Sequence, residues 1–208
     1  FAKASVGAAD MKVNLSKVFA MNAPAENAWA FLQDIKGVAG CMPGAEITAQ
    51  VDATHYQGKV KAKIGPATLA FDGNIEILET DPENRTLRML GKGQDNKGTS
   101  AAEMDLTASV RTGEGGATEL VGTSTVTVTG KAANFGGRMM VQVADRILDQ
   151  FGKNFINNVI AMGEGVAAEE AAAKVSEQPK ELNGLAFLWS VIVGYCKSLF
   201  GKKTPRSQ

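Results

Sequence analysis

Six consecutive stretches of alternating apolar and polar residues constrain the fold of this chain more than any other feature of its sequence. In one of them Phe71, Ile75 and Ile77 share a face, while Asp72 and Glu76 fall on the other face. A period of two is typical of strands with one buried face. Short turns rich in Gly, Pro and Asn separate the stretches, which predicts an antiparallel meander. The predicted strands span residues 46–52, 55–64, 67–80, 86–94, 101–111 and 118–129.

The hydrophobic period changes after the sixth strand, over residues 135–162. Apolar residues recur there at steps of three and four, which places them on one face of a helix. Because the opposite face is polar, the helix must bury one side, and the meander is the surface that it can cover. The apolar face consists of Met140, Val143, Ile147, Phe151, Phe155, Val159 and Met162, and the polar face of Arg138, Gln142, Asp145, Asp149, Lys153 and Asn157.

A further strand, predicted at residues 12–20, precedes the meander. Its apolar side chains include Leu15 and Phe19, and we place Lys12 and Lys17 on its polar face. Pro24 suits the first turn of a helix, so the apolar stripe from Ala25 to Ile35 predicts a helix that ends before Gly37. A second short helical turn is expected at 38–42, before Pro43-Gly44. The order of elements predicts an α+β fold in which an antiparallel sheet curls around a long C-terminal helix, the helix-grip plan.

The chain divides into four parts by composition. We expect a leader or a remnant of cloning at residues 1–10, a helix-grip domain at 11–165, a linker at 166–181 and a hydrophobic tail at 182–208. The Ala- and Glu-rich residues 163–175 are interpreted as the tail of the long helix, and the polar residues 176–181 follow as linker.

Composition argues against several classes of function. The 22 basic and 22 acidic side chains cancel, which disfavours a nucleic-acid partner. Two cysteines far apart, Cys41 and Cys196, favour a reducing compartment over a disulfide scaffold. With a single histidine, His55, no His/Cys metal site can be argued. Cys41 has no visible base beside it, so we interpret it as a turn cysteine and expect neither catalytic residues nor metal ligands.

The apolar residues indicate a binding site. A small curved sheet over a single helix encloses more volume than its own side chains readily fill, and methionines adapt to flexible ligands. We therefore expect an apolar small molecule between the sheet and the helix. The candidate ligand-binding residues are Leu69, Phe71, Ile75, Met89, Met104, Leu106, Val126, Met139, Met140, Val143, Ile147 and Phe151.

The tail has the composition of an interfacial membrane helix. Its uncharged run of about 15 residues is shorter than the roughly 20 that span a bilayer. Aromatic residues and trailing cations suit an anionic membrane surface. A helix packed on its own domain or on a partner is the alternative. The candidate membrane-binding residues are Leu185, Phe187, Leu188, Trp189, Ile192, Tyr195, Leu199, Phe200, Lys202 and Lys203.

Several short segments carry a family resemblance over roughly residues 11–162. They are Cys41-Met42-Pro43-Gly44-Ala45-Glu46, Val60-Lys61-Ala62-Lys63-Ile64-Gly65-Pro66 with Phe71-Asp72-Gly73, Asp81-Pro82 before Arg85, Gly91-Lys92-Gly93, and Val128-Thr129-Gly130-Lys131 with Gly136-Gly137-Arg138. In these segments the chain resembles the family of the carbon monoxide dehydrogenase G subunit (CoxG), within the START-like helix-grip (SRPBCC) superfamily.

The resemblance implies an apolar cavity, a hydrophobic C-terminal tail and a partner, molybdenum-containing carbon monoxide dehydrogenase or a related molybdenum hydroxylase. It further implies a respiratory quinone such as menaquinone as ligand, no tightly bound cofactor, and a cytoplasmic position peripheral to the inner face of the cell membrane. A recruitment adaptor without ligand and a cyclase- or hydrolase-like enzyme stay open as alternatives, because a fold does not determine a function.

Overall fold

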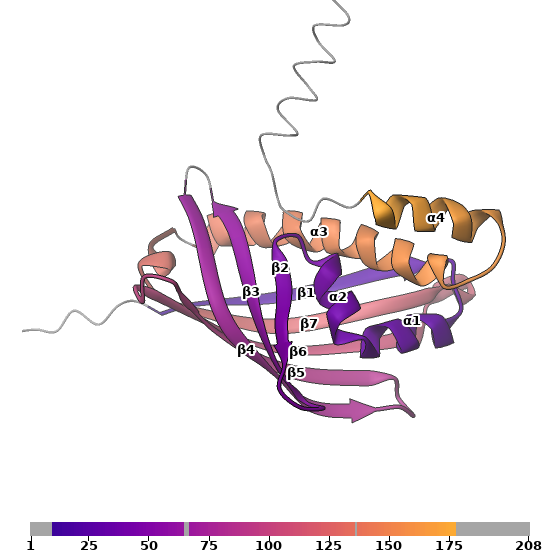
Figure 1. Cartoon of the computed structure of the whole chain (residues 1–208), viewed down its shortest axis with the longest axis horizontal. Helices are drawn as coiled ribbons and strands as arrows, with labels where there is room; N and C mark the ends of the chain where they lie inside the picture. The colour runs from indigo at the N-terminus through magenta and orange to yellow at the C-terminus, as the bar shows by residue number, and fades with distance from the viewer. Residues whose placement is uncertain (1–9, 65–66, 136, 178–208) are drawn as a thin grey trace, which may run out of the picture.

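One seven-stranded antiparallel sheet forms most of the protein in the computed structural model, which describes residues 10–64, 67–135 and 137–177 (Figure 1). The strand order is β1-β7-β6-β5-β4-β3-β2, so the predicted meander is confirmed, and the first strand joins the last. The strands are β1 (Met11–Met21), β2 (Ala45–Gln50), β3 (His55–Ile64), β4 (Ala67–Asp81), β5 (Thr86–Asp95), β6 (Ser100–Thr112) and β7 (Thr118–Gly130).

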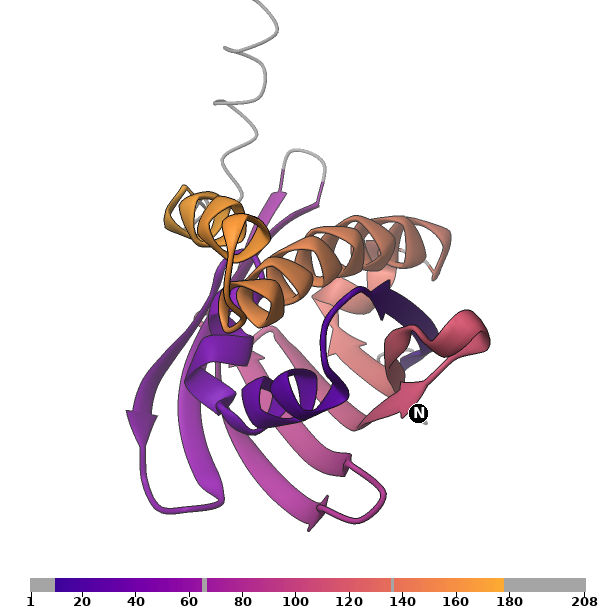
Figure 2. The ribbon, with the colours of Figure 1, turned by 90° about the vertical axis from the view of Figure 1, so that its right-hand side faces the viewer.

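Four α-helices and two short 3-10 helices complete the described residues. The sheet curls beneath α3, which lies across its concave side, as the end-on view shows (Figure 2). The predicted helix-grip plan is therefore confirmed. The helices are α1 (Ala25–Gln33), α2 (Ile35–Cys41), α3 (Gly137–Ala161) and α4 (Val166–Ser176), and the 3-10 helices are η1 (Glu114–Gly116) and η2 (Lys131–Phe135).

The edge strand β1 departs from the prediction at one position. Alternation continues without a break, so Lys17 lies on the inner face between Leu15 and Phe19 rather than on the polar face. Its Nζ is 3.0 Å from Asp145 Oδ1 and 3.6 Å from Asp149 Oδ1, both on α3. An inward charge on an edge strand also discourages pairing with another chain.

The single stripe predicted through Ile35 is instead two helices. Asp34 leaves the helical conformation, with φ −81° and ψ 85°, and so separates α1 from α2. Its carboxylate accepts a hydrogen bond from the Gly37 N–H at 3.1 Å and thereby caps α2. Ile35 belongs to the second helix.

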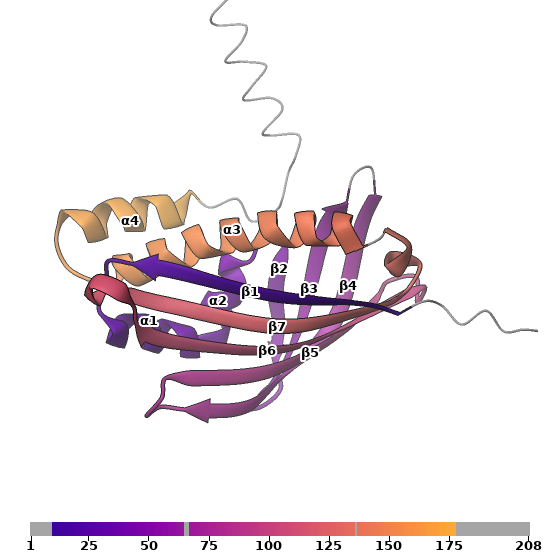
Figure 3. The ribbon, with the colours of Figure 1, turned by 180° about the vertical axis from the view of Figure 1, so that it is seen from behind.

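Residues 166–176, which we expected in a linker, form α4. This helix runs back along α3 (Figures 1 and 3), and Ala168 and Ala171 are buried against it. Alanine is the strongest helix former, and its small side chain allows two helices to approach closely. The composition that resembled a linker therefore favours a packed helix.

The buried core lies at the end of the molecule where α1 and α2 cover the sheet. Phe155 of α3 is fully buried there, with its ring 5.1 Å from that of Phe31 and 5.8 Å from that of Phe151. Gly152 lets α3 approach β1, since a Cβ at this position would lie 2.4 Å from the Phe19 ring. The C-terminal half of α3 is thus fixed by the core.

A matched pair of substitutions tests this uneven packing. Val159 and Val141 lie about five full turns apart on α3 and point in the same direction, but they are 0% and 39% exposed. Val159→Ala should lower the free energy of unfolding by about 2 kcal/mol, and Val141→Ala by less than about 0.5 kcal/mol. Urea unfolding measures both, and equal losses would contradict the packing described here.

Candidate functional site

Burial along α3 falls steadily from its C-terminal half to its N-terminal half. Phe155, Leu148 and Val141 lie one heptad apart and therefore share a face. Phe155 is fully buried, Leu148 is partly buried, and Val141 is 39% exposed. No residue from Gly137 to Phe151 counts as buried, although several face the sheet. The N-terminal half of α3 is therefore not sealed against the strands.

The strands opposite this half of α3 carry apolar side chains that also stay partly exposed. We call these groups together the inner apolar face. Ile75 and Leu106 contact the buried core, and the other members lie beyond it. The members are Leu69, Phe71, Ile75, Met104, Leu106 and Val126 on the sheet and Met140, Val143 and Ile147 on α3.

The strand register brings members of this face into one row. Val126 pairs with Met104, which pairs with Gly91, which in turn pairs with Ile75. Gly91 has no side chain of its own, and the Met104 side chain lies over it, since a Cβ at Gly91 would be 3.7 Å from Met104 Cε. Three more glycines on the same face, Gly58, Gly73 and Gly93, form a second row across β3, β4 and β5.

Three predicted ligand-binding residues lie elsewhere. Met89 is 8% exposed and belongs to the buried core. Phe151 is held in that core by two ring contacts, 6.0 Å from the Phe19 ring and 5.8 Å from the Phe155 ring. Met139 lies one turn before Val143 and shares its side of the helix, but it is 41% exposed at the start of α3. The structure thus brings nine of the predicted residues together on the inner apolar face, while Met89 and Phe151 belong with the core and Met139 lies at the exposed start of the helix.

Two polar groups border the inner apolar face, and sequence reasoning assigned no role to either. Ser124 of β7 pairs with Leu15 and with Leu106, so it lies among inward-facing apolar residues. Lys17 joins β1 to α3, and its hydrogen bond with Asp145 raises the pKa of the ammonium above the usual value. Continuing the period of two through β1 and β7 identifies both positions.

The buried cysteine has a structural role. Cys41 ends α2, its carbonyl accepts a hydrogen bond from Asn154 Nδ2 at 2.9 Å, and Asn158 Nδ2 lies 3.5 Å from its Sγ. Burial raises the pKa of the thiol to about 12, so the group is protonated at neutral pH. A protonated thiol is a poor nucleophile, which agrees with the interpretation of Cys41 as a turn cysteine.

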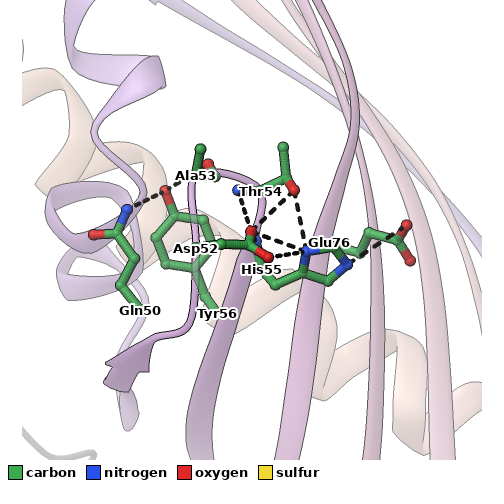
Figure 4. A network of polar contacts seen from close by, with 7 residues as sticks. All are labelled: Gln50, Asp52, Ala53, Thr54, His55, Tyr56 and Glu76. Carbon is green, nitrogen blue, oxygen red and sulfur yellow. Dashed lines mark hydrogen bonds and ion pairs between the residues drawn. The ribbon is translucent and has the colours of Figure 1, made fainter.

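The histidine is the first residue of β3, where the exposed turn from β2 ends (Figure 4). Asp52 accepts hydrogen bonds from the backbone N–H groups of Thr54 and His55, each at 2.8 Å, and its Oδ2 lies 3.0 Å from His55 Nδ1. These bonds, led by that from Thr54, hold the pKa of Asp52 well below its usual range. They close the turn and explain why β2 ends before Asp52.

Within the described residues 10–64, 67–135 and 137–177, no group of three or more His, Cys, Asp and Glu side chains could hold a metal ion. No helix in the same part of the chain is both long and apolar enough to cross a bilayer. The membrane-binding residues predicted at 182–208 lie outside the described residues.

A shallow hollow of about 710 Å³ lies on the outer face of the sheet. Its lining combines apolar atoms, including those of Leu15, with Asn14, Thr107 and Thr125 and with the ion pair between Arg88 and Asp105, which an apolar ligand would have to cover. Apolar ligands prefer apolar linings. The inner apolar face therefore suits such a ligand better than this hollow does.

Solved structures place the fold in a known class. A conserved protein from Geobacillus kaustophilus is 20% identical with a TM-score of 0.63, over 71% of this chain and 95% of that chain. A protein from Thermus thermophilus is 16% identical with a TM-score of 0.51, over 74% and 100%. At these identities the likeness is one of fold. An antiparallel sheet that grips a C-terminal helix defines the helix-grip class, to which START-like proteins belong.

The family is narrower than the fold class. Residues 18–160 match the family model of the carbon monoxide dehydrogenase G subunit (CoxG). Since the match covers more than half of the chain, the chain belongs to the CoxG family. A search of curated proteins finds no match.

The state of Cys41 can be tested with a thiol reagent. In a Cys196→Ser variant, Cys41 should react with dithionitrobenzoate at pH 8 only as fast as the protein unfolds, because the thiol is buried and its pKa of about 12 leaves little thiolate. Absorbance at 412 nm measures the reaction, and the unfolded protein in guanidinium is the control. Rapid labelling of the native protein would contradict the burial.

Proposed function

We propose that this protein binds an isoprenoid respiratory quinone, menaquinone or a close relative, against the inner apolar face. The quinone then passes to or from molybdenum-containing carbon monoxide dehydrogenase, which the protein brings to the cytoplasmic face of the membrane. The observation that carries the proposal is the row of apolar side chains that face α3 yet stay partly exposed. Membership of the CoxG family supports the choice of partner.

The chemistry of a quinone fits this surface. Its ring and isoprenoid chain are apolar, and apolar surface removed from water contributes about 25 cal/mol per Å². The chain confines the quinone to the bilayer, whereas a dehydrogenase outside the bilayer must deliver electrons to it. A carrier that shields the quinone resolves that conflict. The polar partner that we propose for a quinone carbonyl is the hydroxyl of Ser124, whose strand neighbours Leu15 and Leu106 are apolar.

Two other functions make different predictions. A recruitment adaptor needs no ligand, so purified protein would contain none. A cyclase- or hydrolase-like enzyme would convert a polyketide-like or similar substrate. Neither is favoured by a particular contact in the described residues, where Cys41 is protonated and His55 is exposed at the start of β3.

Filling the inner apolar face tests the carrier function. Val143→Trp should lower menaquinone occupancy about tenfold, because the indole would occupy space that the ligand fills, and overpacking costs about 1–3 kcal/mol. The matched control is Val51→Trp, since Val51 is 63% exposed in the β2–β3 turn. Quinone extracted from each purified protein is quantified by mass spectrometry. Wild-type occupancy in a folded Val143→Trp variant would remove the ligand from this face.

Removal of the protein from its host tests the partnership. Without it, carbon monoxide oxidation with artificial dyes should persist, while oxidation coupled to membrane quinone should fall, because the enzyme remains intact but lacks its route to the bilayer. Dye reduction and respiration in membrane fractions measure the two activities. Normal coupling in the deletion strain would contradict the proposed role.

A further inference from the structure

We propose that the end of the molecule where α3 begins docks on an anionic lipid bilayer, with the inner apolar face opening toward the lipid. This inference rests on the quinone-binding function proposed above. We call this end the docking end. It comprises the start of β1, the turn between β5 and β6, η2 and the first two turns of α3. These segments lie together in Figures 1 and 3.

The first two turns of α3 expose apolar side chains on more than one side. Met139 is 41% exposed on the side away from Phe155, and Val141 is 39% exposed on the side that faces the sheet. Single exposed apolar residues are normal. Here Val141 lies on the side of the helix that carries Leu148 and Phe155, whereas Met139 lies one turn before Val143 and extends the α3 side of the inner apolar face toward the helix start. A lipid surface would cover both sides of the helix start.

Cations surround this apolar surface. From Lys131 to Ala144 the chain contains Lys131 and Arg138 but no acidic residue, and both cations are exposed. Lys131 is held beside the β5–β6 turn, since its backbone N–H donates to the Thr99 carbonyl at 3.0 Å. Lys97 of that turn is exposed as well.

The rest of the docking end is close to charge-balanced. Lys12 of β1 pairs in register with Thr127, near the end of β7. Asp10 precedes Lys12 by two residues. Asp95 accepts hydrogen bonds from the N–H groups of Thr99 and Ser100, so this carboxylate closes the turn. The docking end therefore carries a net positive charge.

The opposite end of the molecule is acidic. Its arginines are neutralised, because Arg85 pairs with Glu26 at 2.8 Å and Arg111 pairs with Glu119 at 3.0 Å. Such an asymmetry orients the molecule in the field of an anionic surface, with the docking end toward the lipid. Further exposed carboxylates at this end belong to Asp34, Glu83, Glu114 and Glu164.

The course of the chain agrees with this orientation. α4 runs back along α3 from the acidic end, so the C-terminal end of α4 lies nearer the N-terminal half of α3 than its N-terminal end does (Figure 1). Residues 178–208 follow, and their sequence contains the predicted membrane-binding segment. A tail bound to the bilayer and a docking end facing it are compatible.

Vesicle binding by the full-length chain tests the docking end. The triple variant Lys131→Gln, Arg138→Gln, Met139→Gln should bind vesicles of phosphatidylglycerol and phosphatidylcholine about 30-fold more weakly than the wild type, because each lost cation costs about fivefold near an anionic surface. The matched control is Lys36→Gln, Lys153→Gln, Met162→Gln, which removes two exposed cations and an exposed methionine elsewhere. The control should stay within about twofold of the wild type. Circular dichroism verifies folding, and sedimentation measures binding.

Several outcomes would overturn the inference. Wild-type vesicle binding by the triple variant would show that the tail alone attaches the protein, and equal losses in both variants would show a nonspecific charge effect. Retained vesicle binding with lost capture of carbon monoxide dehydrogenase would assign the surface to a protein. Menaquinone binding in detergent micelles is measured in parallel. Loss of vesicle binding with normal micellar binding supports docking, whereas a wild-type protein that binds no menaquinone in micelles contradicts the proposed function itself.

Discussion

The attachment of only one half of α3 to the core is the constraint on which the rest of the structure depends. Phe155 fills the space between the sheet and α1, Gly152 lets the helix approach Phe19, and Asn154 donates a hydrogen bond to the Cys41 carbonyl. These contacts fix the direction of the helix. The N-terminal half then extends over a sheet that curves beneath it and carries Gly58, Gly73, Gly91 and Gly93 on its inner face.

Stability and ligand binding are thereby separated along one helix. The half that contacts α1 and α2 carries the buried side chains, so changes there are expected to unfold the protein. The half that faces Met104 and Val126 carries partly exposed apolar groups, so changes there are expected to alter binding with little cost in stability. Lys17 holds the helix to the edge strand between these two halves, through Asp145 and Asp149. Because these ion pairs are half-exposed, they position the helix more than they stabilise the fold.

Much of the fold follows from local patterns in the sequence. The period of two identifies all seven strands, and the 3.6-residue period identifies α3 to within two residues at each end.

The predictions that fail do so for physical reasons. A lysine among alternating residues was assigned by its polarity, although the register places Lys17 on the inner face. The Ala-rich residues 166–176 were assigned by composition, although small side chains suit helix packing. Met139 lies on the same side of α3 as Val143, but it is 41% exposed because the helix begins only two residues before it. Asn154 is polar yet buried. Local sequence patterns do not reveal this, because its hydrogen-bond partner Cys41 is distant in sequence.

The contact between the ligand and the inner apolar face can be observed with methyl-labelled methionine. A menaquinone analogue with a shortened isoprenoid chain is added to the full-length protein, and the methionine methyl resonances are followed by NMR. The account predicts that Met104 and Met140 shift on saturation, while Met21 in the core and Met162 just beyond the end of α3 do not. Unchanged Met104 and Met140 resonances at saturating quinone would contradict it.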